Sequence, residues 1–255
     1  KTGIEYRVGR EGRDQTGEPH AAAAADTMFA REFVYCPDVD LEDDVSECVV
    51  SPVKGTPPGG DGGGVRFGIV SAPRRIEALL MINETDISAE SNTGPRARFF
   101  EDSVGIGYHP ITLDDGNPES PATVVTTKPF QVPLRALVHT RIPNLLSGGR
   151  TLGATYVAST AFQGPAVEWC IGEAAGQTAA FCAGNMMTTH DLVNTPDKVD
   201  WLQEFLVDKQ GVPIYWYSDV TPDDDDFVEA QLKPFKDPSF HKQQTTLRYH
   251  SGGGE

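Results

Sequence analysis

Residues 144–150, with the sequence Asn-Leu-Leu-Ser-Gly-Gly-Arg, predict a short apolar strand that ends in glycines. A loop of small residues follows at 151–163, and a helix is predicted over 165–183 because proline suits the first helical position. This helix carries Gly172 and Gly176, and a glycine inside a helix costs about 1 kcal/mol relative to alanine. Close approach of another backbone or of a ligand usually offsets that cost. We therefore expect the strand, the loop and the helix to be buried and packed on one another.

A second helix is predicted after Thr195, which suits the N-cap position and precedes a proline. Gly211 lies just past the expected end of this helix, where glycine commonly terminates helices. The aspartates at 223–226 predict a solvated acidic turn. Further strands are expected at 29–35, within 67–82, within 99–113 with turn glycines at 105 and 107, and at 212–217.

The chain is acidic, with 37 acidic and 21 basic side chains among 255 residues and a formal net charge of −16. Such a charge repels phosphate backbones and anionic membrane surfaces, so a nucleic-acid partner is not expected. No apolar run approaches the roughly 20 residues that a membrane helix needs, so no membrane span is expected. The composition predicts a soluble globular protein.

The cysteines and histidines predict little specific chemistry. Cys170 and Cys182 fall on the 165–183 helix about 18 Å apart along its axis, too far to form a disulfide. Cys36 and Cys48 flank an acidic loop and could pair. Histidines at 109, 139 and 190 show no metal-ligand spacing, so no metal site is predicted.

Several stretches share one resemblance and occur in a fixed order. They lie at 6–11, 73–76, 102–108, 129–137, 142–146, 149–155, 167–176 and 211–216. The stronger matches include Pro-Phe-Gln-Val-Pro-Leu-Arg-Ala-Leu at 129–137 and Val-Glu-Trp-Cys-Ile-Gly-Glu-Ala-Ala-Gly at 167–176. Together they resemble the C-terminal flavin-binding block of FAD-dependent oxidoreductases in the glutathione-reductase-like flavoprotein superfamily. The resemblance covers most of residues 1–220.

The resemblance implies an oxidoreductase with FAD as its cofactor. The residues that it assigns to cofactor binding are Gly149, Arg150, Gly153, Ala154, Thr155, Val167 and Gly172. Arg150 would place a cation near the FAD pyrophosphate and ribityl chain, and the N-terminus of the 165–183 helix would face the pyrimidine end of the flavin. That end gains negative charge on reduction, so the helix dipole would favour hydride acceptance.

Three loop positions depart from the family pattern. Tyr156 stands where relatives commonly have histidine, Gln163 stands where they commonly have arginine, and Pro165 lies near a second histidine position. Tyr156 is the one candidate for a catalytic side chain, and a packed aromatic residue is the alternative. Arg74 and Arg75 could bind an acidic substrate group or could protect a strand edge by their charge.

The sequence contains no Gly-x-Gly-x-x-Gly segment, which would hold the ADP part of FAD. The expected organisation has three parts. They are a β-rich substrate-side region at 1–128 with a Gly/Pro-rich linker near 55–64, the C-terminal portion of an FAD-binding domain at 129–211, and a C-terminal strand with an acidic tail at 212–255. The fold class is α/β, or α+β for the fragment taken alone.

Two functions are compatible with these features. The chain is either part of an FAD-dependent oxidoreductase that a separate or missing dinucleotide-binding half completes, or a flavin-free, non-catalytic family member in a larger complex. We expect a partner subunit in both cases, because the helix face of Gly172, Ala175, Gly176 and Ala179 needs a covering surface. The first function also requires a small-molecule substrate.

Overall fold

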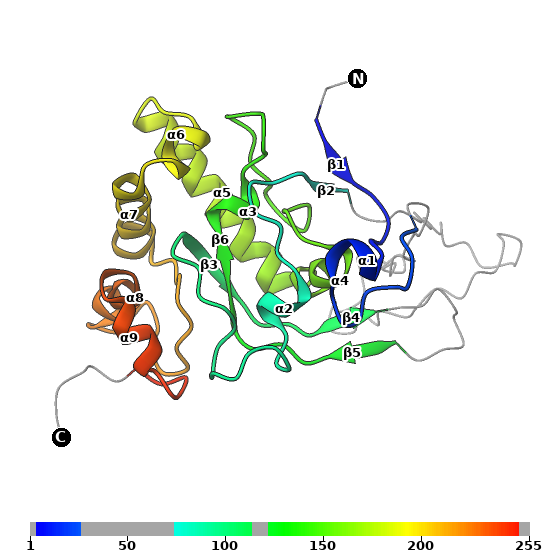
Figure 1. The fold of residues 1–255 in the computed structure, drawn as a ribbon. Helices are drawn as coiled ribbons and strands as arrows, with labels where there is room; N and C mark the ends of the chain where they lie inside the picture. The colour runs from blue at the N-terminus through cyan, green and yellow to red at the C-terminus, as the bar shows by residue number, and fades with distance from the viewer. Residues whose placement is uncertain (1–3, 27–73, 114–121, 250–255) are drawn as a thin grey trace, which may run out of the picture.

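The computed structural model describes residues 4–26, 74–113 and 122–249 (Figure 1). The strand expected at 29–35, the linker near 55–64 and the Cys36–Cys48 pair lie outside these residues. The strands are β1 (Tyr6–Arg7), β2 (Arg75–Ile76), β3 (Ser103–Gly107), β4 (Ile111–Leu113), β5 (Thr123–Val125) and β6 (Phe130–Pro133). The helices are α1 (Arg13–Thr16), α2 (Glu84–Ile87), α3 (Leu134–Leu137), α4 (Tyr156–Ser159), α5 (Pro165–Gly184), α6 (Thr189–Val193), α7 (Pro196–Glu204), α8 (Phe227–Lys236) and α9 (Pro238–Gln243), with a 3₁₀ turn at Thr160–Phe162 and a π-helical turn at Phe205–Lys209. This mixture of helices and small sheets agrees with the predicted mixed class of fold.

The described strands form three antiparallel pairs, β1 with β2, β3 with β6, and β4 with β5. The β3–β6 pair lies alongside α5 near the middle of the molecule (Figure 1). A Cβ atom at Gly105 would lie 2.7 Å from the Sγ of Cys170 on α5, and one at Gly107 would lie 2.4 Å from the ring of Phe130. The prediction that these glycines form turns is therefore wrong. They lie inside β3, where the missing side chains let α5 and the Phe130 ring approach the strand.

One main hydrophobic core and one small aromatic cluster hold the described residues together. The core side chains come from many elements, among them β3, β6, α3, α4, α5 and α7, and the most buried include Ile82, Ile87, Val104, Phe130 and Ile171. The second cluster contains Tyr215, Tyr217, Ala230 and Phe240, and lies beside the C-terminal helices.

Helix α5 confirms the helix predicted over 165–183. Proline occupies its first turn, and one face buries Val167, Ile171, Ala174, Ala175, Thr178 and Cys182. The opposite face carries Trp169, which is 77 % exposed, the charged Glu173, and the small residues Gly176, Ala179, Ala180 and Ala183. The helix is therefore packed on one side only by the described residues.

The strand predicted at 144–149 is wrong. The segment is extended, but it forms a single antiparallel bridge between Leu146 and Val138. The Ser147 amide donates to the Leu137 carbonyl at 2.8 Å, and the His139 amide donates to the Leu145 carbonyl at 3.3 Å. Glycines at 148 and 149 then turn the chain away, so the pairing does not extend into a ladder.

The strand predicted at 212–217 is also wrong. These residues are buried and extended, but their amides do not pair with a strand. The amides of Ile214 and Tyr215 both donate to Oε1 of Gln231 on α8, each at 2.8 Å. A side-chain amide therefore satisfies the backbone donors that a neighbouring strand would otherwise bond.

The second predicted helix is confirmed as α7 and the π-helical turn that follows it. Thr195 precedes Pro196 as expected, but the Thr195 hydroxyl donates to the carbonyl of Asp191 instead of capping α7. Gly211 adopts a φ of +65° beyond the helical residues, where glycine is favoured. The aspartates at 223–226 form an exposed turn before α8, which agrees with the prediction.

Helix α2 has a complete capping box. Oδ1 of Asn83 accepts from the amides of Thr85 at 2.9 Å and Asp86 at 3.3 Å, and the Asp86 carboxylate accepts from the Asn83 amide at 3.0 Å. Such reciprocal bonds satisfy amides that a helix leaves unpaired at its start. Within the described ranges, no helix is long and apolar enough to cross a membrane.

Candidate functional site

A broad surface cleft of about 580 Å³ lies where the turn at 148–151 meets the first turn of α5. We call it the α5 cleft. Its lining is formed by Gly148, Gly149, Arg150, Thr151, Pro165, Glu168 and Trp169. Two of the residues assigned to the cofactor by resemblance, Gly149 and Arg150, are thus gathered with the start of the predicted helix.

The cleft has one cation and one anion on its walls. Arg150 and Glu168 are each about half-exposed, and Nε of Arg150 lies 3.8 Å from Oε1 of Glu168. An ion pair of this exposure contributes little, typically about 0–1 kcal/mol.

The N-terminus of α5 adds partial positive charge to the same cleft. Its N-cap is Gly164, which has no side chain to cap the helix, and the first helical residue is a proline. The amides of the first turn have no acceptor within the helix, so this end of a 20-residue helix attracts anions. A Cβ atom at Gly164 would lie 2.7 Å from Cδ2 of His109, so glycine is required there by packing.

The loop after the cleft is fixed by buried contacts. A Cβ atom at Gly153 would lie 2.3 Å from the Cβ of Ala78, and the Gly153 amide donates to the Ala136 carbonyl at 2.8 Å. Ala154 forms a parallel bridge with Ile82. These residues are buried and do not line the α5 cleft.

The remaining predicted cofactor residues also have structural contacts. The Thr155 hydroxyl donates to Oε1 of Glu18 at 2.5 Å and accepts from the Ala158 amide at 3.2 Å, which caps α4. Val167 is buried on the side of α5 that faces β3, and Gly172 lies near the carbonyl of Gly148. The structure therefore brings Gly149 and Arg150 to the cleft, and it places the other five around the loop and the helix.

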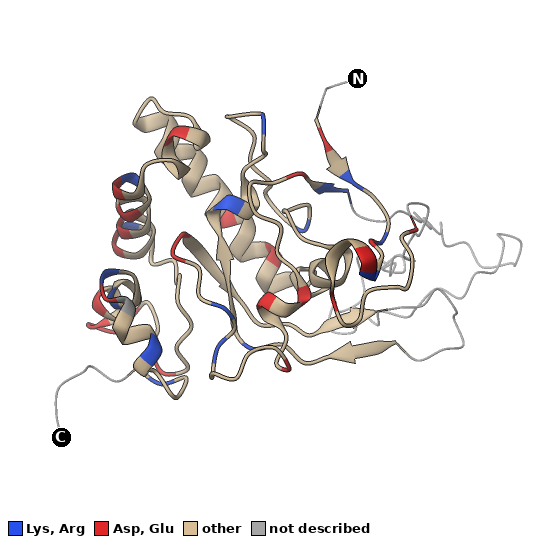
Figure 2. Ribbon diagram, in the orientation of Figure 1, with Lys and Arg blue, Asp and Glu red and all other residues tan. Residues whose placement is uncertain are grey.

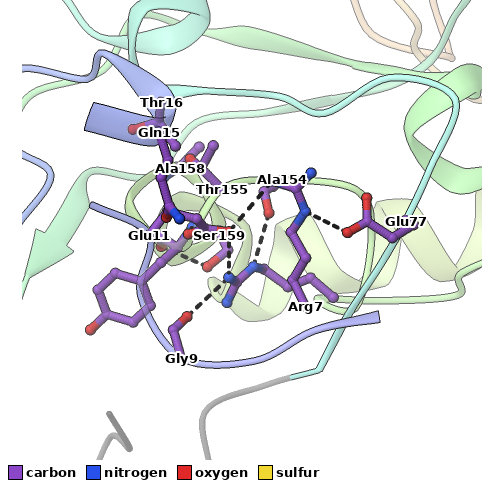
Figure 3. A network of polar contacts seen from close by, with 12 residues as sticks. Arg7, Gly9, Glu11, Gln15, Thr16, Glu77, Ala154, Thr155, Ala158 and Ser159 are labelled. Carbon is purple, nitrogen blue, oxygen red and sulfur yellow. Dashed lines mark hydrogen bonds and ion pairs between the residues drawn. The ribbon is translucent and has the colours of Figure 1, made fainter. Parts of the chain in front are cut away.

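A buried arginine, Arg75, holds this loop against the N-terminal segment. Figure 3 labels its partners Gly9, Glu11 and Ala154. Arg75 is 0 % exposed, and it donates to the carbonyls of Ala154 at 2.9 Å and Gly9 at 3.0 Å and to Oε1 of Glu11 at 2.9 Å. The other oxygen of Glu11 accepts from the Tyr156 amide at 2.7 Å. Arg75 therefore has a structural role. The structure supports neither of the two roles considered for it, which were binding of an acidic substrate group and protection of a strand edge by charge. Its neighbour Arg74 is exposed and lies over the Tyr6 ring.

A second buried polar group lies on the other side of the same loop. The carboxylate of Glu18 accepts from the Glu84 amide at 2.6 Å as well as from Thr155, and burial raises the pKa of Glu18. Glu84 in turn is hydrogen-bonded to the backbone and ring of His20. No sequence pattern predicts that Glu18, Thr155 and Glu84 meet, because Thr155 and Glu84 are far from Glu18 along the chain.

Tyr156, the candidate catalytic residue, is buried in this region. Its ring lies 6.0 Å from the guanidinium carbon of Arg75, and it does not line the α5 cleft. Sequence reasoning also missed Trp169, which lines the cleft, and Gly164, which is the N-cap of α5. A large aromatic side chain among the small residues of α5, and a glycine directly before a helix-starting proline, were the available signals. No group of metal-ligating side chains occurs in the described part of the chain.

The residues of the α5 cleft fit the flavin end of FAD. Cofactor pockets usually measure about 300–1,000 Å³, and this cleft falls within that range. Arg150, the glycine backbone and the uncapped start of α5 are the donors that a phosphate or a reduced, anionic ring requires. The sequence offers no matching segment for the ADP end.

Comparison with known proteins gives one match. The family model described as FAD dependent oxidoreductase matches residues 72–206, which are 135 of the 255 residues. The match includes the whole of the α5 cleft. No curated protein and no solved structure matches the chain.

Proposed function

Because the chain belongs to the FAD dependent oxidoreductase family, whose cofactor is FAD, we propose that it binds the flavin end of FAD in the α5 cleft and oxidises a small organic substrate. The observation that carries this proposal is the meeting of Arg150 and the start of α5 at one cleft. These two sources of positive charge are joined by the loop at 151–163, and both fall within the residues that match the family.

When bound, the flavin supplies an acceptor for two electrons and a proton. The contribution of the chain is electrostatic. Arg150 holds positive charge at the cleft, and the first-turn amides of α5 favour negative charge on whatever group faces them. Glu168 holds the guanidinium of Arg150 in the cleft while no anion is bound.

We further propose that a dinucleotide-binding chain or segment covers the exposed face of α5. This face presents Trp169 and Glu173 followed by the small residues Gly176, Ala180 and Ala183, and small side chains allow another backbone to approach closely. Gly176 has no atom within 4 Å of its Cβ position, so this part of α5 is open among the described residues. A partner seated here would lie next to the α5 cleft and could supply the ADP-binding part of the site.

A flavin-free structural subunit is the second candidate function. It is favoured by the burial of Tyr156 and Thr155, which fixes the loop through protein contacts alone. The two functions differ in a direct observation. An oxidoreductase purified with its partner is yellow and shows flavin absorbance, and a structural subunit is colourless under the same conditions.

The decisive variant is Arg150→Ala, assayed with the dinucleotide-binding partner present. Loss of a hydrogen bond to a charged group typically costs about 1.5–3 kcal/mol, so the Kd for FAD should rise by roughly 10- to 150-fold. Arg141→Ala is the matched control, because Arg141 is exposed and pairs with Glu5 away from the cleft. Flavin fluorescence titration measures both. Unchanged affinity in Arg150→Ala, or absence of flavin from the wild-type complex, would exclude the proposed site.

A further inference from the structure

A second cavity, of about 380 Å³, lies between the loop before β3 and helix α9. We call it the basic cavity. The charged and aromatic residues of its wall are Arg96, Arg98, Phe99, Tyr215, His241 and Lys242. They come from three segments, the first of which is more than a hundred residues from the other two, and none of them lines the α5 cleft.

The charge of the basic cavity is opposite to that of the chain. Two arginines, a lysine and a histidine line it, and no described aspartate or glutamate does, although the net charge of the protein is −16. Figure 2 shows the contrast with α7, where acidic residues predominate. Arg98 pairs with Asp86 at 2.8 Å, but its side chain is 60 % exposed. The structure gives Lys242 no ion pair with a described residue.

Arg96 is a buried cation that has only neutral hydrogen-bond partners among the described residues. It is 7 % exposed and donates to the carbonyls of Trp216 at 2.6 Å, Thr246 at 2.9 Å and Leu247 at 3.3 Å. Its guanidinium carbon also lies 4.5 Å from the centre of the Tyr215 ring. Buried charges are normally paired with an opposite charge, since the low dielectric interior penalises an isolated ion. The interior beside this cavity therefore carries positive charge, which the carboxylate of Asp219 offsets in part.

The cavity also has an aromatic wall. The ring centroids of Phe99 and His241 lie 4.5 Å apart, and those of Phe99 and Tyr215 lie 6.3 Å apart in an edge-on arrangement. The Tyr215 hydroxyl and Nδ1 of His241 are 3.0 Å apart, which fixes the two rings relative to each other. A bare inorganic anion would leave this surface uncovered. An organic anion with a flat or apolar body would satisfy both the cations and the rings.

We propose that the basic cavity binds a small organic carboxylate with a flat, apolar body. The carboxylate faces Arg98 and Lys242 at the rim and the field of Arg96 behind them, and the body lies against Phe99 and His241, the partly exposed rings of the wall. The volume of about 380 Å³ is at the small end of ligand pockets, so the ligand is small. This site is independent of the flavin, because it uses none of the residues of the α5 cleft.

Benzoate is the probe, and isothermal titration calorimetry of the purified chain with its partner is the measurement. Benzamide is the neutral control of the same shape, and inorganic phosphate is the anion without an aromatic body. We expect saturable benzoate binding, and affinities for benzamide and phosphate that are each lower by about tenfold or more. Saturation is expected in buffers of low ionic strength and should weaken with added salt.

Variants at the rim locate the site. Arg98→Gln combined with Lys242→Gln should weaken benzoate binding by about tenfold, because charge-assisted contacts to the carboxylate are lost. Lys236→Gln is the matched control, because Lys236 lies on the neighbouring helix α8 and pairs with Glu204 outside this cavity. Rim variants are used because they are exposed, so folding is not at issue. The proposal is overturned if benzoate does not saturate, if benzamide or phosphate binds as well, or if the double variant binds like Lys236→Gln. None of these results depends on whether flavin binds.

Discussion

The substitution Arg75→Met tests whether the buried arginine holds the N-terminal segment to the loop after the α5 cleft. Methionine retains most of the apolar stem and fills much of the volume, so the change removes mainly the charge and the hydrogen bonds. Three bonds are lost, two to backbone carbonyls and one to Glu11 at 2.9 Å. The side chain of Glu11 is only 11 % exposed, and it is left without its closest cation.

The expected cost follows from this geometry. Removing one partner of a buried ion pair costs about 3–5 kcal/mol, because the remaining charge stays buried and uncompensated. Arg7 lies 3.9 Å from the same Glu11 oxygen and offsets part of that penalty, so the lower half of the range applies. With a urea m-value of roughly 2–3 kcal/mol/M, the unfolding midpoint should fall by about 1–2 M.

Urea unfolding followed by circular dichroism measures the change. The matched control is Arg74→Met, the same substitution at the adjacent exposed arginine, which should alter the free energy of unfolding by less than about 0.5 kcal/mol. In a Glu11→Gln background, Arg75→Met should cost less than in the wild type, because no unpaired carboxylate remains. Equal midpoints for Arg75→Met and Arg74→Met would refute the structural role given to Arg75.

Three further predictions concern stability. Burial raises the pKa of the Glu18 carboxyl, so the stabilising contribution of this group is full below its ordinary pKa of 4.5 and is lost as pH rises through the raised pKa. Urea unfolding between pH 4 and pH 8 should show that Glu18→Gln removes this decline in stability. A pH profile of stability that is the same in the variant would contradict the prediction. Gly153→Ala should destabilise the chain by about 1–3 kcal/mol, because its Cβ atom would collide with Ala78. Gly176→Ala meets open space inside a helix and should stabilise the free chain by about 0.5–1 kcal/mol. Thermal unfolding that ranks the two variants in the opposite order would contradict the packing described around these two glycines. Asn83→Ala should cost about 1 kcal/mol by removing the α2 cap, and Asn83→Ser, which can still cap, should restore most of it in the same assay.

Local chemistry in the sequence was enough to predict the two longest helical regions, which contain α5 and α7, but it did not predict α8 or the shorter helices. Pro165 marks the start of α5 because its ring fixes φ and its missing amide is not needed there, and Gly211 ends the second helical region because it accepts a positive φ. Both signals act within one or two turns of the chain. The glycine-rich turn that carries Arg150 was assigned to a candidate site by the family resemblance of its sequence, before its surroundings were known.

Strands and buried polar groups were decided by the tertiary structure. The 144–149 and 212–217 segments have strand-like sequences, but a strand needs a neighbouring ladder, and here Leu146 has one bridge while the amide of Ile214 bonds to Gln231. Arg75 and Glu11 are 64 positions apart, and the walls of the basic cavity are farther apart still. No sequence pattern encodes such meetings, because their energy arises only when folding removes water from groups that are distant along the chain.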